Sequence, residues 1–379
     1  MPEPTPAADP AVTYASAGVD VEAGDRAVQL MKAAVARTHG PQVLGGLGGF
    51  AGLVDASELK GYRRPLLATS TDGVGTKVAI AQALDVHDTI GFDLVGMVVD
   101  DIVVCGARPL LMTDYIACGK VVPERVAAIV RGIAAACEVA GCPLLGGETA
   151  EHPGLLGPSE YDLAGAATGV VEADELLGPH RVRPGDTVIA MASSGLHANG
   201  YSLVRRVLEV SGWTLHHHVD DLGRSLGEEL LTPTRVYAAD VLDLARALGP
   251  GLHALAHVTG GGLAANLARV LPRGSEAVVD RGTWTPPPIV DLIARLGPVP
   301  RPDLERTFNL GVGMLAVVAA DRAAEAAARL SGRGVPAWPC GLVEPAAPEA
   351  RTRPGDDAVR GTKGVDGGSV RMVGDHPAS

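Results

Sequence analysis

The chain has 379 residues, which is long enough for two domains, because single hydrophobic cores rarely grow beyond about 250 to 300 residues. Its 44 acidic residues outnumber its 32 basic residues, and a net charge of -12 opposes binding to a polyphosphate backbone, so we expect no nucleic-acid partner. No apolar run reaches the ~18 residues of a membrane span, the N-terminus lacks the features of a secretory signal, and the five cysteines form no C-x-x-C pair. We therefore expect a cytoplasmic protein with reduced thiols and no membrane partner.

Strand-like apolar runs alternate with alanine-rich helical segments along most of the chain, a pattern typical of α/β or α+β folds. The alternation is interrupted near residue 172 by VEADELLGPHRVRPGD, which has few apolar positions and two prolines. We predict an N-terminal domain over residues 12–172 and a C-terminal domain over residues 173–344. Residues 1–11 and 345–379 are rich in Pro, Ala, Gly and charge without periodicity, and we predict that both are mobile tails.

The stretch STDGVGTK at residues 70–77 directly follows the apolar run PLLAT and lacks the residue order of a P-loop. Read as a strand end, a turn and a helix start, it offers glycines for close backbone approach and helix N–H groups for an anion. Lys77 could neutralise phosphate, whereas Asp72 would repel it. That conflict disappears if Mg²⁺ lies between them, because Mg²⁺ binds carboxylates together with phosphate oxygens. An ordinary Asp-Gly turn is the alternative.

A helix is the favoured interpretation of FDLVGMVVDDIVVCGARP at residues 92–109, because it gathers one apolar stripe. Asp93 and Asp100 then share the opposite face, with Asp101 on its flank, whereas a strand would direct Asp100 and Asp101 to opposite faces. These acids and Glu148, in LLGGETAEHPG, are candidate metal ligands. The alternative for each is an ordinary solvated acid. The stripe consists of Leu94, Val95, Val98, Val99 and Ile102.

Two glycine-rich turns in the second half of the chain are candidate ligand sites. In ASSGLHANGYSLVRR, His197 and Asn199 lie between glycines at a strand-to-helix turn, which exposes backbone donors and two polar side chains. A surface loop with a capping Asn is the alternative. In LAHVTGGGLAANLARVLPRGSEAVVD, the pattern G-x-G-x-x-A follows a short apolar run, and Asp280 ends the next one. A dinucleotide-binding protein is therefore a legitimate rival interpretation.

Ten motifs, taken in order, resemble those of the phosphoribosylformylglycinamidine cyclo-ligase family, also called aminoimidazole ribonucleotide synthetase. They are YASAGVD, GGFAGL, TDGVGTK, HDTIGFDLVGMVVDDIVVCGARPL, GGETAEHPG, YDLAGAATGVVE, GLHANGYSLVR, LLTPTRVY, HVTGGGLAANLARVLP and FNLGVGM. The resemblance covers about residues 12 to 344, and ten ordered motifs are far more specific than any single glycine pattern.

The resemblance implies a homodimer with two α/β (α+β) domains per chain. The N-terminal sheets would pair into a dimeric β-barrel with flanking helices, and the C-terminal domain would hold a mixed sheet with helices. The implied reaction, in de novo purine biosynthesis, is the ATP-dependent ring closure of formylglycinamidine ribonucleotide to 5-aminoimidazole ribonucleotide, with release of ADP and phosphate. ATP and Mg²⁺ are the implied co-substrate and metal.

For such phosphoryl transfer, a protein mainly has to position the reactants and neutralise the charge of the phosphates. The resemblance implies roles for four groups of residues. The catalytic residues would be Lys77 and His197. The ATP-binding residues would be Asp72, Gly73, Val74, Gly75, Thr76 and Lys77. The metal ligands would be Asp72, Asp101 and Glu148, to which the acidic helix face adds Asp93 as a candidate. The substrate-binding residues would be His197, Asn199, Gly260, Gly261, Gly262 and Asn309.

The chain departs from the family pattern at three positions. It has Asp100, Arg108 and His152 where the family usually has Asn, Glu and Met, respectively. The extra charge of Asp100 could tighten metal binding or pair with a nearby base. His152 adjoins a proposed ligand, and its ordinary interpretation is a neighbour without a role.

Overall fold

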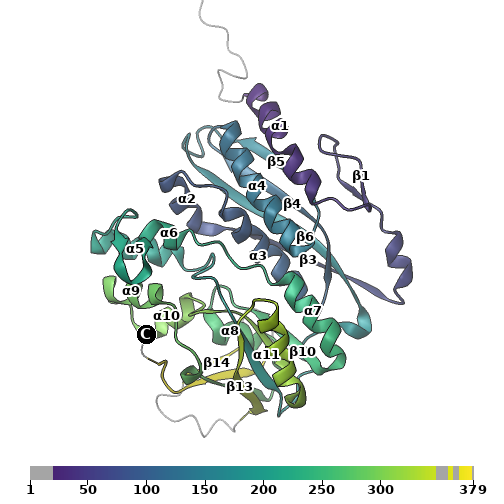
Figure 1. Ribbon diagram of the computed structural model, residues 1–379, viewed down its shortest axis with the longest axis vertical. Helices are drawn as coiled ribbons and strands as arrows, with labels where there is room; N and C mark the ends of the chain where they lie inside the picture. The colour runs from purple at the N-terminus through teal and green to yellow at the C-terminus, as the bar shows by residue number, and fades with distance from the viewer. Residues whose placement is uncertain (1–19, 347–356, 362–366, 378–379) are drawn as a thin grey trace, which may run out of the picture.

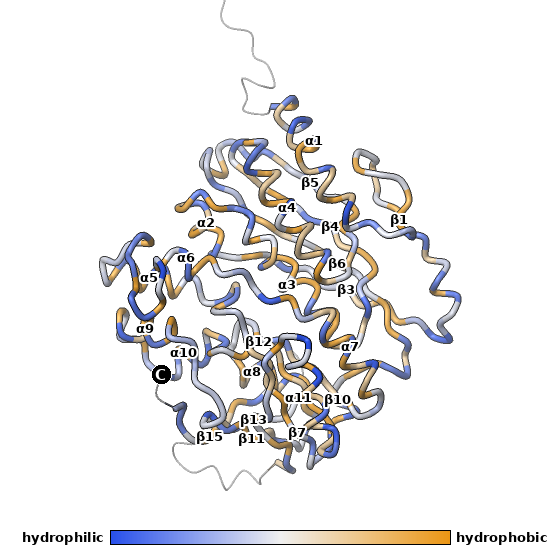
Figure 2. The backbone as a smooth tube through the Cα atoms, in the orientation of Figure 1, coloured by the Kyte–Doolittle hydropathy of each residue, from blue (hydrophilic) through white to orange (hydrophobic). Residues whose placement is uncertain are grey.

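The computed structural model describes residues 20–346, 357–361 and 367–377, so the tail expected at residues 1–11 lies outside the described residues. Each half of the chain contains a β-sheet with helices packed on it (Figure 1). Hydrophobic residues run along α3 and α4 (Figure 2), and α3 is buried between the N-terminal sheet and the C-terminal half. All five cysteines are free, as expected, and within the described residues no helix is long and apolar enough to cross a membrane.

The N-terminal half contains a four-stranded sheet in the order β3-β6-β4-β5, in which only β4 and β5 are parallel. Its elements are α1 (Val21–Arg37), β1 (Val43–Leu44), β2 (Leu53–Val54), η1 (Ser57–Gly61), β3 (Pro65–Gly73), η2 (Gly75–Lys77), α2 (Val78–Leu84), α3 (Ile90–Val103), β4 (Arg108–Cys118), α4 (Pro123–Ala140), β5 (Leu144–Glu151) and β6 (Tyr161–Glu172).

Helix α3 confirms the helical interpretation of its sequence. The predicted apolar stripe is buried against β3, β6 and β4, and α4 packs beside α3 (Figure 1). Gly165 in β6 permits this contact, because a Cβ there would lie 3.4 Å from the Leu94 side chain and 2.7 Å from that of Met112. On the opposite face of the sheet, the side chains of Leu67 and Tyr115 are exposed.

The C-terminal half contains a seven-stranded mixed sheet in the order β10-β12-β7-β13-β11-β15-β14, in which only β11 and β15 are parallel. Its elements are η3 (Ala173–Glu175), β7 (Thr187–Ala192), α5 (Tyr201–Ser211), β8 (His218–Val219), η4 (Asp220–Leu222), β9 (Arg224–Ser225), α6 (Leu226–Leu230), α7 (Ala238–Leu248), η5 (Gly249–Gly251), β10 (Leu252–His257), α8 (Gly262–Arg269), β11 (Ser275–Asp280), η6 (Arg281–Thr283), α9 (Pro288–Leu296), α10 (Arg301–Thr307), β12 (Val312–Val318), η7 (Ala320–Arg322), α11 (Ala323–Gly332), β13 (Ala337–Pro345), β14 (Asp357–Arg360) and β15 (Ser369–Val373).

The fold is therefore mixed α/β, as expected. Among the described residues, no strand crosses from one sheet to the other, and β6 ends at Glu172 before β7 begins at Thr187. The domain boundary near residue 172 stays a prediction.

The expectation of a mobile tail over residues 345–379 is wrong for its described part. Strand β15 pairs with β11, and β14 then pairs with β15, so both extend the C-terminal sheet. Val370 and Met372 point into the core of that sheet. The sequence analysis did not predict the five-residue strand β15, because its partner β11 lies about ninety residues away in sequence and no local pattern indicates the pairing.

The sheet topology contradicts the dinucleotide-binding interpretation of the G-x-G-x-x-A motif. That fold places the strands before and after the glycine-rich turn in one parallel unit built around the bound nucleotide. Here β12, β7 and β13 separate β10 from β11, and among the described strands β10 pairs only with the antiparallel β12.

Candidate active site

A cleft of about 650 Å³ lies between the two halves of the chain. Residues 72–76 form one wall. The rest is lined by Met97, residues 198–203, residues 259–260 and Thr307. The structure thus places the predicted phosphate loop opposite the glycine-rich turns of the second half.

The 72–76 loop begins with the last two residues of β3, and the backbone at two of its positions requires glycine. A Cβ on Gly73 would lie 2.9 Å from the carbonyl oxygen of Leu163, and Gly75 has a φ of +73°. Asp72 is half-buried and accepts a 2.7 Å hydrogen bond from the Gly73 N–H. At the end of the loop, the Thr76 hydroxyl lies 3.0 Å from the Ser202 hydroxyl and links the two walls.

Lys77 does not reach the cleft, contrary to the sequence-based expectation. Its side chain is fully buried, and Nζ donates to Asp93 Oδ1 at 2.7 Å, to the His197 carbonyl at 2.9 Å and to the Thr232 carbonyl at 2.7 Å. These three acceptors use all three protons of an ammonium group, so none is left for phosphate. The turn at Gly75–Lys77 directs this side chain into the contact between the two halves.

Asp93 and Asp100 are not exposed metal ligands, although they share one helix face as predicted. Asp93 accepts from the backbone N–H and the hydroxyl of Thr234 at 3.1 and 2.5 Å, and Asp100 accepts from the Tyr237 N–H at 3.0 and 3.1 Å. Burial raises the pKa of Asp93, and it raises that of Asp100 to about 7. A sequence pattern cannot distinguish a face that meets water from one that receives donors of another domain.

Asp101 is partly exposed and holds His257, a residue that the sequence analysis did not single out. Asp101 Oδ1 lies 2.9 Å from His257 Nδ1. Burial alone would lower the pKa of His257, but the hydrogen bond to Asp101 and the charges of Asp100, Asp101 and Asp72 raise it. A signal was available, because His257 ends a strand just before the glycine-rich turn.

Glu148 lies too far from Asp72 for both to ligate one ion within this chain. It is exposed on β5, and the strand order β3-β6-β4-β5 puts three spacings of about 4.8 Å, about 14 Å, between the two strands. Among the residues that the structure describes, no group of three or more His, Cys, Asp or Glu side chains is arranged to hold a metal. The predicted four-carboxylate ligand set is therefore not brought together.

His197 and Asn309 hold the loop that follows β7 and do not face the cleft. His197 is buried with a φ of +60°, and its Nε2 accepts the Ser194 N–H at 3.2 Å. Burial, followed by the charges of nearby cations, holds the pKa of His197 well below its usual value, so the ring is neutral. Asn309 donates to the Gly195 carbonyl at 2.8 Å and accepts from the Gly311 N–H at 2.9 Å.

Asn199 and Gly260 do line the cleft, as expected. They are close neighbours, since a Cβ on Gly260 would lie 3.5 Å from Asn199 Oδ1. Gly261 and Gly262 instead form the turn, with φ values of +107° and +72°. A Cβ on Gly262 would lie 1.7 Å from the carbonyl oxygen of Glu305, so only glycine fits there.

The other two departures from the family pattern have local partners. Arg108 donates to Glu58 at 2.6 Å, and both side chains are exposed. His152 Nε2 lies 3.2 Å from the Tyr115 hydroxyl. Neither residue lines the cleft.

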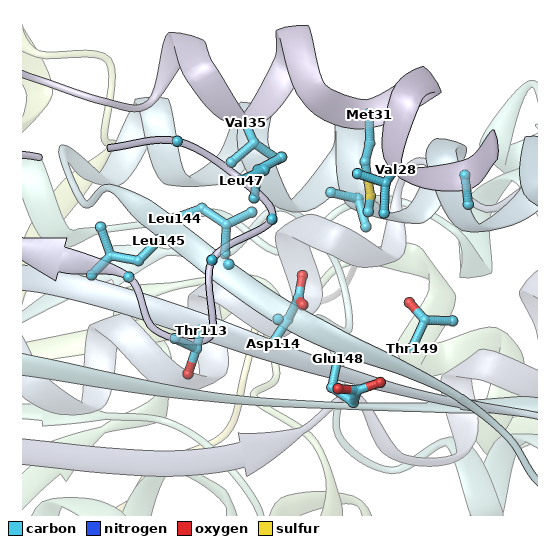
Figure 3. A pocket seen from close by; sticks show the side chains of 18 of the residues that line it. Val28, Met31, Val35, Leu47, Thr113, Asp114, Leu144, Leu145, Glu148 and Thr149 are labelled. Carbon is cyan, nitrogen blue, oxygen red and sulfur yellow. The ribbon is translucent and has the colours of Figure 1, made fainter. Parts of the chain in front are cut away.

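A second cavity, of about 680 Å³, lies beneath α1 and was not anticipated from the sequence. Its apolar lining includes Val28, Met31 and Leu47, and Figure 3 shows the Asp114 carboxylate rising from the sheet toward α1. Burial raises the pKa of Asp114 to about 7. Glu148 lines this cavity and not the cleft.

Two family models match the chain, the AIR synthase related protein N-terminal domain over residues 55–171 and the C-terminal domain over residues 183–351. A phosphoribosylformylglycinamidine cyclo-ligase of Anaeromyxobacter dehalogenans is 50% identical over 342 residues, which are 90% of this chain and 98% of the relative. The same-named protein of Brevibacillus brevis is 48% identical over 332 residues, which are 87% and 95% of the two chains.

Solved structures share the fold at low sequence identity. Thiamine-monophosphate kinase from Stenotrophomonas maltophilia has a TM-score of 0.64 at 18% identity and covers 93% of this chain and 97% of its own. The hydrogenase maturation protein HypE, in complex with ATP, has a TM-score of 0.57 at 20% identity, with coverage of 86% and 87%. Given both matched domain models and relatives about half identical over nearly their whole length, the chain belongs to the phosphoribosylformylglycinamidine cyclo-ligase family.

Proposed function

We propose that this chain is the ATP-dependent ligase that closes the imidazole ring in purine biosynthesis. It converts formylglycinamidine ribonucleotide and ATP to 5-aminoimidazole ribonucleotide, ADP and phosphate. The cyclo-ligase name of its relatives supports this ring closure. The observation that carries this proposal is the cleft, where the 72–76 loop of one half faces Asn199 and Gly260 of the other.

The chemistry explains why two facing loops suffice. An amide oxygen is a poor leaving group, so ATP first phosphorylates the formyl oxygen of the substrate; the amidine-side nitrogen then attacks that carbon, and phosphate leaves. The protein must hold the transferred phosphate of ATP in line with the formyl oxygen and neutralise the charge of the phosphates. It needs no strong nucleophile of its own. We assign the nucleotide phosphates to the backbone N–H groups of Gly75 and Thr76, because those of Gly73 and Val74 already donate to Asp72 and to the Leu163 carbonyl. We assign the ribonucleotide to the wall formed by Asn199 and Gly260.

The donor set of the cleft fits one Mg²⁺ that is carried in by the nucleotide. Mg²⁺ in such sites uses one or two carboxylates plus substrate phosphates, and it does not need a closed protein cage. Asp72 is the carboxylate on the cleft wall, and Asp101 binds His257, whose pKa the charges of both Asp101 and Asp72 raise. When bound, Mg²⁺ would neutralise the phosphate charge that Asp72 alone would repel.

We assign the nucleoside of ATP to the second cavity beneath α1. Its apolar lining with a few polar side chains, Asp114 and Thr149 among them, is the combination that small-molecule sites use.

We also propose that the chain forms a homodimer through the face of the N-terminal sheet that α3 leaves uncovered, with the two sheets closing into a β-barrel. Leu67 and Tyr115 are exposed on this face. An open sheet with an apolar uncovered face is unfavourable in water, and pairing two such faces would bury it.

The direct test incubates the protein with formylglycinamidine ribonucleotide, ATP and Mg²⁺ and measures aminoimidazole ribonucleotide by diazo coupling. We expect Asp72→Asn to lower kcat by about a hundredfold, because a carboxylate ligand of the Mg²⁺ that neutralises the phosphates is lost. Asn199→Ala should raise KM for the ribonucleotide about tenfold. The control is Asp220→Asn, whose carboxylate is fully exposed away from the cleft and whose loss should leave turnover unchanged. Folded protein that hydrolyses ATP or binds it without making the ring product would refute the proposal.

A further inference from the structure

The strongest unexplained feature of this molecule is a buried ionic cluster between its two halves. The side chains of Lys77 and Asp93 are both 0% exposed, and their charges lie 2.7 Å apart. Lys77 also binds the carbonyls of His197 and Thr232, and Asp93 also binds the backbone and hydroxyl of Thr234. Lys77 and Asp93 come from the N-terminal half, and all the other partners come from the C-terminal half.

The cluster is attached directly to both walls of the cleft. Lys77 follows Thr76, the last residue of the proposed phosphate loop, and the carbonyl that it binds belongs to His197, which precedes Ala198 and Asn199 on the opposite wall. One ammonium group therefore connects the two walls through a single residue on each side.

We infer that Lys77 and Asp93 are positioning residues, which set the distance and orientation between the 72–76 loop and the 197–200 loop. This inference rests on the proposed function of the cleft and deepens it. In-line phosphoryl transfer between ligands held by two different walls depends on their relative placement, and a misplacement of about 1 Å can lower the rate by about a hundredfold.

Stability alone is a poor explanation for the cluster. Removing two charges from water is costly, and replacing a buried ion pair by neutral groups of similar size is often neutral or stabilising, whereas removing one partner is destabilising. Burial lowers the pKa of Lys77 and raises that of Asp93, and in both cases the charge and hydrogen bond of the partner oppose the shift. Fixed directional bonds, which a neutral pair would lose, are the property that a positioning role requires.

The test is the double variant Lys77→Met with Asp93→Asn, which removes both charges and leaves a side-chain amide oxygen at position 93 to accept the Thr234 N–H. The melting temperature should lie above that of Lys77→Met alone, because the double variant leaves no unpaired carboxylate in the buried cluster. The Kd for ATP should change by less than about threefold, because the 72–76 backbone is intact, while kcat falls about a hundredfold. A matched control neutralises the Arg329–Asp243 pair within the C-terminal half, with N–O distances of 2.7 and 3.0 Å, and should leave kcat unchanged.

Two results would overturn the inference. If the folded double variant turns over within about threefold of the parent, the cluster is only structural. If ATP binding weakens in proportion to kcat, Lys77 contacts the phosphates directly.

Should the double variant fail to fold, Thr234→Val removes only the hydroxyl that donates to Asp93 and should lower kcat in the same direction with ATP binding preserved. Hydrogen exchange supplies a readout that does not depend on turnover. The amides of residues 197–203 should exchange faster in the double variant than in the Arg329 and Asp243 control, and equal exchange would refute the positioning role even if the parent made no ring product.

Discussion

The Asp114→Asn substitution should remove a pH-dependent part of the free energy of unfolding. Burial raises the pKa of the Asp114 carboxyl from 3.8 to about 7. The folded state therefore binds this proton more tightly than the unfolded chain does. The resulting stabilisation is fully present below pH 3.8 and is lost as pH rises through 7. An amide has no proton to lose, so the variant should lack this slope.

The magnitude follows from the two pKa values. The difference between 3.8 and about 7 corresponds to about 4 kcal/mol at 1.36 kcal/mol per pH unit. Of this, about 2.6 kcal/mol should be lost between pH 5 and pH 8. Because Asp114 lines an open cavity and is not fully shielded from solvent, we expect a measured loss of about 1 to 2.6 kcal/mol.

Urea unfolding of the parent and of Asp114→Asn at pH 5 and pH 8 measures this loss. Other titrating groups, including Asp100, contribute equally to both proteins, so the difference between the two pH dependences isolates Asp114. If the parent and the variant lose the same free energy between these pH values, within about 0.5 kcal/mol, the argument from burial is refuted.

Two further predictions concern the turn before α8 and the uncovered sheet face. Gly262→Ala should lower the free energy of unfolding by more than about 3 kcal/mol in thermal unfolding, because its Cβ would lie 1.7 Å from the Glu305 carbonyl oxygen. The control is Gly334→Ala, at φ +82° in open space, which should lower it by only about 1 to 2 kcal/mol. Comparable losses in the two variants would contradict the steric reason. Leu67→Glu should halve the particle mass that light scattering measures, because it places a charge on the proposed dimer face. Val210→Glu, at an exposed position on α5, should leave that mass unchanged. A parent protein that is monomeric would refute the dimer proposal.

The sequence determined those parts of the fold and site that depend on neighbouring residues. The stripe from Leu94 to Ile102 predicted α3, because a 3.6-residue period gathers apolar side chains on one face whatever the helix packs against. The glycines of residues 73–75 predicted a tight turn after β3, and that turn lines the cleft with Asn199 and Gly260. The ordered motifs identified the family, which the relatives bear out.

Only the tertiary structure decided which polar groups face the cleft. Lys77 and Asp93 were both plausible ligands of a nucleotide complex, but they bind each other and the C-terminal half instead. Glu148 and Asp72 were grouped by resemblance, yet two strands lie between theirs. Strand β15 depends on a partner distant in sequence. The physical reason is common to these cases: a local pattern fixes the side of an element on which a residue lies, and only the packing of distant segments fixes what that side contacts.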